Sequence, residues 1–91
     1  MKSLCIKIIS LLKRKKLKVS IAESCTGGML CSTITAVGGS SKIFKLGIVS
    51  YSNESKIKLL KVSKKIIIKY GSVSKQVCNT MLKNVSKIGK T

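Results

Sequence analysis

The stretch AESCTGG, residues 22–28, gathers side chains that can attack a carbonyl or bind an anion. A Ser-x-Thr-Gly-Gly turn leading into a helix places Ser24 just outside the helix N-terminus, where free backbone N–H groups and the positive end of the helix dipole converge. This position suits a substrate phosphate, or the oxyanion that forms when a serine attacks a carbonyl. Gly27 and Gly28 let the backbone approach a ligand closely. A helix cap and tight turn without chemistry has the same pattern, and both interpretations stay open here.

A nucleophilic serine needs a base, and the chain has no histidine to supply one. Lysine, tyrosine and glutamate are the remaining candidates. The pattern places Tyr51 and Lys56 at the end of a second strand and in the first turn of the helix that follows. If the two strands are parallel neighbours, this turn lies at the same sheet edge as Ser24, where ligands of open α/β sheets bind. Serine–lysine pairs are a known alternative to the histidine triad. The competing interpretation of Lys56 is an ordinary solvated lysine.

The elements that must position these residues follow from hydrophobic periodicity. Residues 3–14 carry apolar side chains on one helical arc, which predicts an amphipathic helix packed on the rest of the chain, or a basic helix on a membrane surface. Residues 17–21 alternate apolar and polar, which predicts a strand running into the motif. Residues 29–37 have helical spacing, and Gly38 and Gly39 end the helix. The motif therefore sits at a strand-to-helix turn.

A second strand is predicted in IFKLGIVSYS, residues 43–52, with Gly47 as its weak point. The residues expected on one face of it are Phe44, Leu46 and Ile48. The following SNESK predicts a helix start, with Ser52 or Asn53 as the N-cap and Glu54 in the first turn.

The last third of the chain predicts two more helices. Residues 64–70 form a short one closed by Gly71, and Ser72 or Ser74 caps the final one. The apolar stripe of the final helix is Val77, Met81, Leu82, Val85 and Ile88. The order of elements predicts a single α/β domain over residues 1–91. Because a two-stranded sheet rarely supports a fold by itself, we expect further chain or a partner, such as a second copy in a homo-oligomer, to complete it.

The positive charge of the chain suggests nucleic-acid binding, since the sequence has 19 Lys and Arg residues and only two acidic ones. Only Arg14 is an arginine, and three aromatic residues offer little stacking surface. The lysines are spread along the chain, with one dense run in residues 13–18. This composition is typical of an AT-rich genome, and it predicts only non-specific contact with nucleic acid.

The four cysteines form no C-x-x-C pair, and the chain has no histidine, so no metal site is predicted. Residues 1–16 start like an export signal, but Lys7 interrupts their apolar run and no small-residue cleavage site appears. No apolar run is long enough to span a bilayer. We therefore expect reduced thiols, a cytoplasmic location and no membrane association.

Three segments together resemble the C-terminal domain of the CinA family: AESCTGG, GSSKIFKLGIVSYSNESKIKLLKV and YGSVS. The resemblance covers roughly residues 5–85 and keeps the motifs in the family's order and spacing. It implies a small sheet sandwiched between helices, and an amidase that converts nicotinamide mononucleotide to nicotinate mononucleotide and ammonia. It implies no metal or organic cofactor.

The resemblance also implies roles for single residues. Ser24 is the expected nucleophile, Lys56 its base, and Tyr51 a helper in proton transfer. The turn at Thr26, Gly27 and Gly28 is expected to hold the oxyanion or the nucleotide phosphate. Further substrate contacts are expected from Glu23, Ser41 and Asn53.

The departures from the family are equally specific. Family domains are much longer, with further strands and another glycine-rich loop, and nothing after Val85 resembles that second half. Lys61 stands where a glycine is usual, and Ser72 where an alanine is usual. The sequence therefore predicts a truncated amidase domain. The alternatives are an inactive remnant of that domain and a basic nucleic-acid-binding protein.

Overall fold

The computed structural model describes residues 2–91 as alternating helices and strands followed by three consecutive helices. The elements are α1 (Lys2–Lys15), β1 (Val19–Glu23), α2 (Met29–Thr35), the 3-10 helix η1 (Ser40–Lys42), β2 (Phe44–Val49), α3 (Asn53–Leu60), α4 (Lys64–Tyr70) and α5 (Lys75–Gly89). The predicted α/β class and both predicted strands are confirmed. Of the alternative N-caps, Ser52 caps α3 and Ser74 caps α5. Their side chains accept hydrogen bonds from Ser55 N and Val77 N, respectively.

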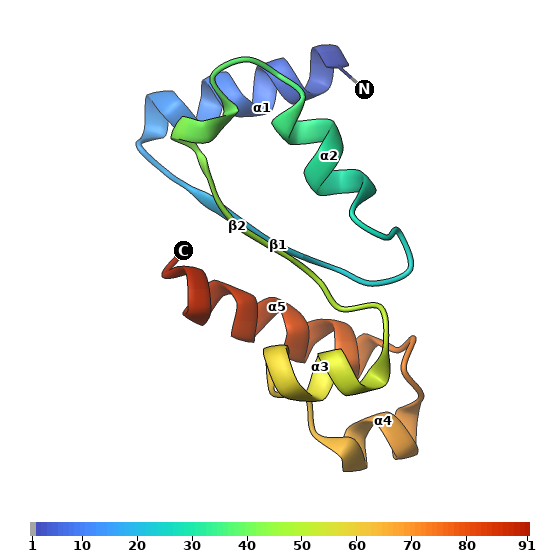
Figure 1. Ribbon diagram of the computed structural model, residues 1–91. Helices are drawn as coiled ribbons and strands as arrows, with labels where there is room; N and C mark the ends of the chain where they lie inside the picture. The colour runs from blue at the N-terminus through green and yellow to red at the C-terminus, as the bar shows by residue number, and fades with distance from the viewer. Residues whose placement is uncertain (1) are drawn as a thin grey trace.

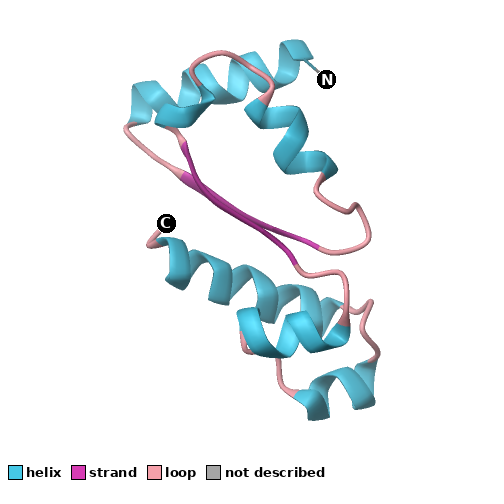
Figure 2. Ribbon diagram, in the orientation of Figure 1, coloured by secondary structure: helices cyan, strands magenta, loops and turns pink. Residues whose placement is uncertain are grey.

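The two strands form a thin central layer between two layers of helices (Figures 1 and 2). Helices α1 and α2 cover one face, and their contact with the sheet buries one apolar cluster, made of Cys5, Ile9, Ile21, Ile34 and Ile43. Helices α3, α4 and α5 cover the other face and bury a second cluster, made of Leu60, Val62, Ile67, Val77, Met81 and Val85. The sheet therefore separates two small cores.

Strands β1 and β2 pair in parallel, so the turns that follow them lie at the same edge of the sheet. The register shifts near the start of the pairing, where Lys45 is an extra residue on β2. Such a bulge reverses the face on which the following side chains lie. The prediction that Phe44, Leu46 and Ile48 share one face is therefore wrong. Phe44 packs with the α1–α2 cluster, whereas Leu46 and Ile48 pack against the α3–α5 cluster.

Gly47, predicted to weaken β2, lies at a close approach between β2 and α2. A Cβ atom at this position would stand 2.9 Å from Cys31 Sγ and 2.9 Å from Phe44 Cζ. Real Cβ atoms do not approach other atoms so closely, so a larger residue would require the side chains of Cys31 and Phe44 to move. The glycine makes the tight packing of this face possible.

Helix α1 packs on the molecule through Cys5 and Ile9, as predicted for an amphipathic helix. Other members of its apolar arc, Leu4 among them, remain partly exposed. Within residues 2–91, no helix combines the length and the apolar character needed to cross a bilayer.

Candidate active site

The AESCTGG segment forms the predicted turn between β1 and α2. Gly27 has a φ of 62° and Gly28 a φ of 98°, a region that residues with side chains rarely adopt. A Cβ on Gly28 would lie 3.3 Å from Val49 Cγ2, so the turn also passes close to the end of β2. The path of the backbone therefore favours glycine at both positions.

Glu23, the last residue of β1, is buried and fastens this turn to α2. Its Oε1 accepts hydrogen bonds from Thr26 Oγ1 at 2.6 Å and Leu30 N at 2.8 Å, and its Oε2 accepts one from Cys31 N at 2.9 Å. Burial by itself would raise the pKa of this carboxyl, but the hydrogen bonds from Cys31, Thr26 and Leu30 outweigh it and lower the pKa to about 2. Glu23 is therefore ionised at neutral pH.

This arrangement corrects the expectation that the first N–H groups of α2 are free for a substrate anion. The carboxylate of Glu23 already accepts from two of them, at Leu30 and Cys31. It also accepts a hydrogen bond from the hydroxyl of Thr26. The substrate contacts expected from Glu23 and the Thr26 side chain would have to compete with these bonds.

Ser24 follows Glu23 and is half-buried at the carboxyl edge of the sheet. Among residues 2–91, no hydrogen bond engages its hydroxyl, and the backbone N–H groups of Cys25 and Thr26 have no acceptor. Two neighbouring N–H groups beside a free hydroxyl are the donors that an oxyanion on the attacked carbon needs. The turn thus offers a nucleophile together with potential oxyanion donors.

Lys56, in the first turn of α3, is only 2% exposed. Its Nζ donates to the backbone oxygens of Ser50 at 2.9 Å and Tyr51 at 3.2 Å. The interpretation of this residue as a solvated lysine is therefore wrong. Fully buried lysines are rare unless they are paired with a carboxylate.

Neither acidic side chain of the chain pairs with Lys56. Glu54 forms its ion pair with Lys58 at 2.9 Å on the exposed side of α3. Glu23 accepts its hydrogen bonds from Thr26 and the start of α2. Within the described residues, the amine of Lys56 is thus buried among neutral backbone oxygens only.

A hollow of about 200 Å3 brings Ser24 and Lys56 together at the carboxyl edge. Its remaining lining comes from Ala22 and Cys25, from the α4–α5 loop, and from α5; these last residues are Ser72, Val73, Ser74, Val77, Cys78 and Met81. No hydrogen bond joins Ser24 to Lys56 within residues 2–91, so the two face one space without touching. The predicted shared edge is therefore present as a physical cavity.

The loop between α4 and α5 also lines the hollow, although the sequence patterns predict no role for it. YGSVS is one of the three segments that carry the family resemblance, but nothing in its pattern indicates which edge of the sheet it reaches. Ser74 is occupied, since its hydroxyl caps α5 and donates to Gly71 O at 3.0 Å. Ser72, in contrast, has no hydrogen-bond partner among the described residues.

Of the predicted site residues, only Ser24 and Lys56 line this hollow. Glu23, Thr26, Gly27 and Gly28 belong to the turn described above, and the three others are Tyr51, Asn53 and Ser41. The side chain of Tyr51 is 72% exposed, and the residue takes part through its carbonyl oxygen, which accepts from Lys56. Asn53 is exposed at the first position of α3. Ser41 lies in η1, which precedes β2, and is therefore at the opposite edge of the sheet. Their predicted roles would need contacts that this arrangement does not form.

No group of three or more His, Cys, Asp or Glu side chains within residues 2–91 could hold a metal ion.

Sequence comparison relates the chain to a known protein family. A model of the CinA C-terminal domain matches residues 1–91. The chain belongs to the CinA C-terminal domain family. A competence-damage inducible protein of Thermoanaerobacter pseudethanolicus is 47% identical over 81 residues, and a CinA-like protein of Prochlorococcus marinus is 48% identical over 80 residues.

Solved structures of CinA proteins share the fold. The competence/damage inducible protein CihA of Agrobacterium tumefaciens superposes with a TM-score of 0.96 at 32% identity, over 99% of this chain. A CinA superfamily protein of Escherichia coli does so with a TM-score of 0.96 at 29% identity. The arrangement of two strands and flanking helices described above is therefore that of a CinA domain.

The match covers only part of these CinA relatives. The chain spans 20% of the Thermoanaerobacter protein and 19% of the Prochlorococcus protein. It spans 55% of the Agrobacterium structure and 52% of the Escherichia coli one. Similarity to this part of the relatives does not by itself establish that the chain has the activity of a whole CinA protein.

Proposed function

We propose that this chain is an amidohydrolase that deamidates nicotinamide mononucleotide to nicotinate mononucleotide and ammonia. The observation that carries the proposal is the buried Lys56 amine, which has no carboxylate partner and shares a hollow with the unbonded hydroxyl of Ser24. A buried base beside a free hydroxyl is the arrangement that activates a serine without histidine. The choice of nicotinamide mononucleotide as the substrate rests on the resemblance to the CinA family.

The proposed reaction starts with attack of Ser24 Oγ on the carboxamide carbon. The hydroxyl proton passes to the neutral amine of Lys56, and the carbonyl oxygen becomes an oxyanion that the N–H groups of Cys25 and Thr26 stabilise. Lys56 then gives the proton to the departing nitrogen, which leaves as ammonia. Water hydrolyses the resulting acyl-serine and restores the hydroxyl.

The hydrogen bonds of Lys56 suit the role of base. A neutral amine carries two N–H bonds and one lone pair, whereas an ammonium has three N–H bonds and no lone pair. The two carbonyl oxygens of Ser50 and Tyr51 take up two N–H donors. The proposed mechanism needs this amine to present a lone pair to the hollow that Ser24 also lines.

The size of the hollow favours a ring bearing an amide over a whole nucleotide. Its volume of about 200 Å3 is below the ~300–1,000 Å3 that is usual for small-molecule sites. We infer that the nicotinamide ring enters between Val73, Val77 and Met81, and that the ribose phosphate lies outside. We place the reaction in the cytoplasm, where the four free cysteines of the chain stay reduced.

The test is ammonia release from nicotinamide mononucleotide by the 91-residue chain. We expect turnover in the parent and a loss of about 100- to 10,000-fold in both Ser24→Ala and Lys56→Ala. Ser32→Ala and Lys58→Ala are the matched controls, since these exposed residues lie on α2 and α3 outside the hollow, and their activity should equal that of the parent.

A folded parent that releases no ammonia would contradict the proposal and favour an inactive CinA domain. Folding is checked by thermal unfolding of the same samples, where a cooperative transition is required. A non-cooperative transition with no turnover would favour the remnant interpretation even more directly. Equal losses in the controls and the two site variants would contradict the assignment of Ser24 and Lys56.

A further inference from the structure

A second, larger hollow lies at the amino edge of the sheet, the end opposite Ser24. It encloses about 380 Å3 and is formed by the end of α1, the link to β1, and η1 with the residue that follows it. Four lysines line it: Lys13, Lys16, Lys18 and Lys42. Its apolar lining is Leu12, Leu17 and Ile43.

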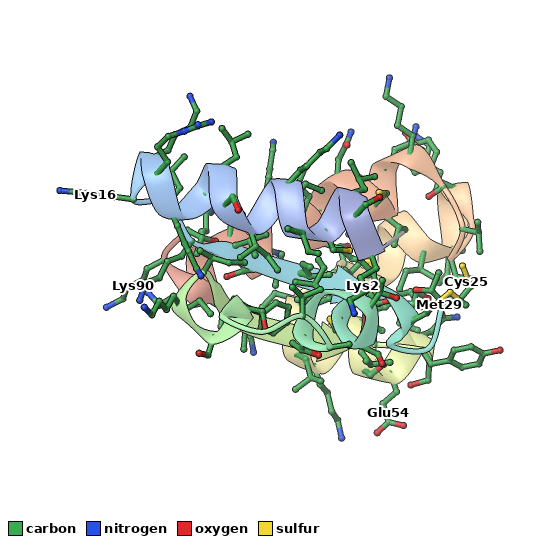
Figure 3. All side chains as sticks on the ribbon, turned by 90° about the horizontal axis from the view of Figure 1, so that it is seen from above. Lys2, Lys16, Cys25, Met29, Glu54 and Lys90 are labelled. Atoms are coloured by element: carbon green, nitrogen blue, oxygen red, sulfur yellow. The ribbon has the colours of Figure 1, made fainter. Side chains whose placement is uncertain are left out.

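Within residues 2–91, no acidic side chain forms an ion pair with these lysines. The two glutamates of the chain are engaged elsewhere, Glu23 at the carboxyl edge and Glu54 with Lys58. Figure 3 shows Lys16 and Lys90 at one end of the molecule and Cys25 and Met29 at the other, so the end of α5 adds positive charge at the lysine end. The C-terminal end of α1 contributes only about half a negative charge through its dipole, which four lysines exceed.

The backbone holds two of the lysines in place. Lys13 Nζ lies directly against Gly39, where a Cβ atom would collide with it, and Gly39 has a φ of 84°. Lys16 itself has a φ of 56°, an uncommon conformation for a residue with a side chain. The hydrogen bonds from Lys16 N to Lys13 O and from Leu17 N to Leu12 O fix this last turn of α1.

We propose that this hollow binds a small anion that carries several phosphates on an apolar or aromatic body, as a nucleoside triphosphate does. Lysine ammonium groups bind phosphate as point charges, and several of them on different segments suit several phosphates. The apolar lining provides a surface for the rest of the ligand, and the volume falls within the range of small-molecule sites. The site is separate from Ser24 and independent of the proposed amidase function.

Isothermal titration with ATP, in the absence of magnesium and at low salt, tests this proposal. We expect saturable binding to one site. The double variant Lys18→Gln/Lys42→Gln should weaken it by about tenfold or more, because two charged contacts to phosphate are lost. The matched control is Lys64→Gln/Lys65→Gln, which removes the same charge from exposed positions on α4 and should leave the affinity unchanged.

Three results would overturn the proposal. Equal weakening in the two double variants would show that ATP is attracted only by the diffuse positive charge. Tripolyphosphate binding as tightly as ATP would exclude a contribution of the apolar lining. A single-stranded oligothymidylate that binds more tightly than ATP and loses affinity in Lys18→Gln/Lys42→Gln would assign the hollow to a nucleic-acid strand instead.

Discussion

The two edges of the sheet differ in how their polar groups are held. At the carboxyl edge, Glu23 and Lys56 are buried, and each is fixed by hydrogen bonds to backbone groups. At the amino edge, the four lysines of the larger hollow have no ion-pair partner within residues 2–91. Buried and fixed groups suit a reaction, which depends on orientation, whereas exposed charges suit binding, which depends on attraction. The proposed reaction site and the proposed anion site thus lie at opposite ends of the two strands.

The largest expected difference between the edges is in folding stability. Glu23→Gln replaces a carboxylate that accepts from two N–H groups by an amide whose own NH2 group faces one of them. We expect a loss of about 2–3 kcal/mol in the free energy of unfolding, measured by urea denaturation. Lys42→Gln at the amino edge should change the same quantity by less than about 0.5 kcal/mol. Similar losses in the two variants would remove the contrast.

The same carboxylate predicts how stability depends on pH. Its pKa falls from 4.5 in the unfolded chain to about 2 in the folded protein, so the folded state favours the ionised form. The stabilisation is fully present above pH 4.5 and is lost as the pH falls toward 2. Urea denaturation across this range should show the decline in the parent and a much weaker one in Glu23→Gln. An identical decline in both would place the titrating group elsewhere.

Two lysines in left-handed conformations allow a smaller, matched test. Lys16 directly follows α1 at the amino edge with a φ of 56°, and Lys61 directly follows α3 with a φ of 54°. Replacing either by glycine removes the strain, and we expect a gain of about 0.5–1 kcal/mol in each case. Only Lys16→Gly should also weaken ATP binding. A loss of ATP affinity in Lys61→Gly would contradict the location of the anion site.

The smallest expected difference between the edges is in the rate at which their cysteine thiols are alkylated. Cys25 and Cys78 are exposed and should react with iodoacetamide in the native protein. Cys5 is buried, and burial together with its hydrogen bond to Glu23 raises the pKa of Cys31 to about 11, so both should react slowly. Nicotinamide mononucleotide should protect Cys25 and Cys78, which line the smaller hollow, and ATP should not. Protection of Cys25 and Cys78 by ATP, and not by nicotinamide mononucleotide, would contradict the placement of the two ligands in their respective hollows.

The sequence allowed much of the carboxyl edge to be predicted, because its signals are local. Alternation of apolar residues, paired glycines and serine caps gave the strand-to-helix turns, and parallel pairing then placed Ser24 and Lys56 at one edge. Gly47 was recognised as unusual for a strand, but the nearness of Cys31 and Phe44 that explains it arises only in the folded chain.

Other features depended on contacts that the sequence pattern does not encode. The bulge at Lys45 has no sequence signature, and it reversed the expected face of Leu46 and Ile48. Glu23 was expected to bind substrate, but the tight turn brings its carboxylate back onto α2. The hollow with four lysines combines segments that are apart in the sequence, so the dense run in residues 13–18 pointed to only part of it.

The amine of Lys56 also joins Ser50 and Tyr51, so it closes the connection between β2 and α3. Selection for folding alone is therefore enough to retain this lysine in a lineage that no longer performs any reaction. Ser24 is different, since its hydroxyl holds nothing together among residues 2–91 and can drift once catalysis is no longer selected. Under the proposed mechanism, we therefore expect replacement of Ser24 among related sequences to accompany loss of activity, and replacement of Lys56 to accompany loss of the fold.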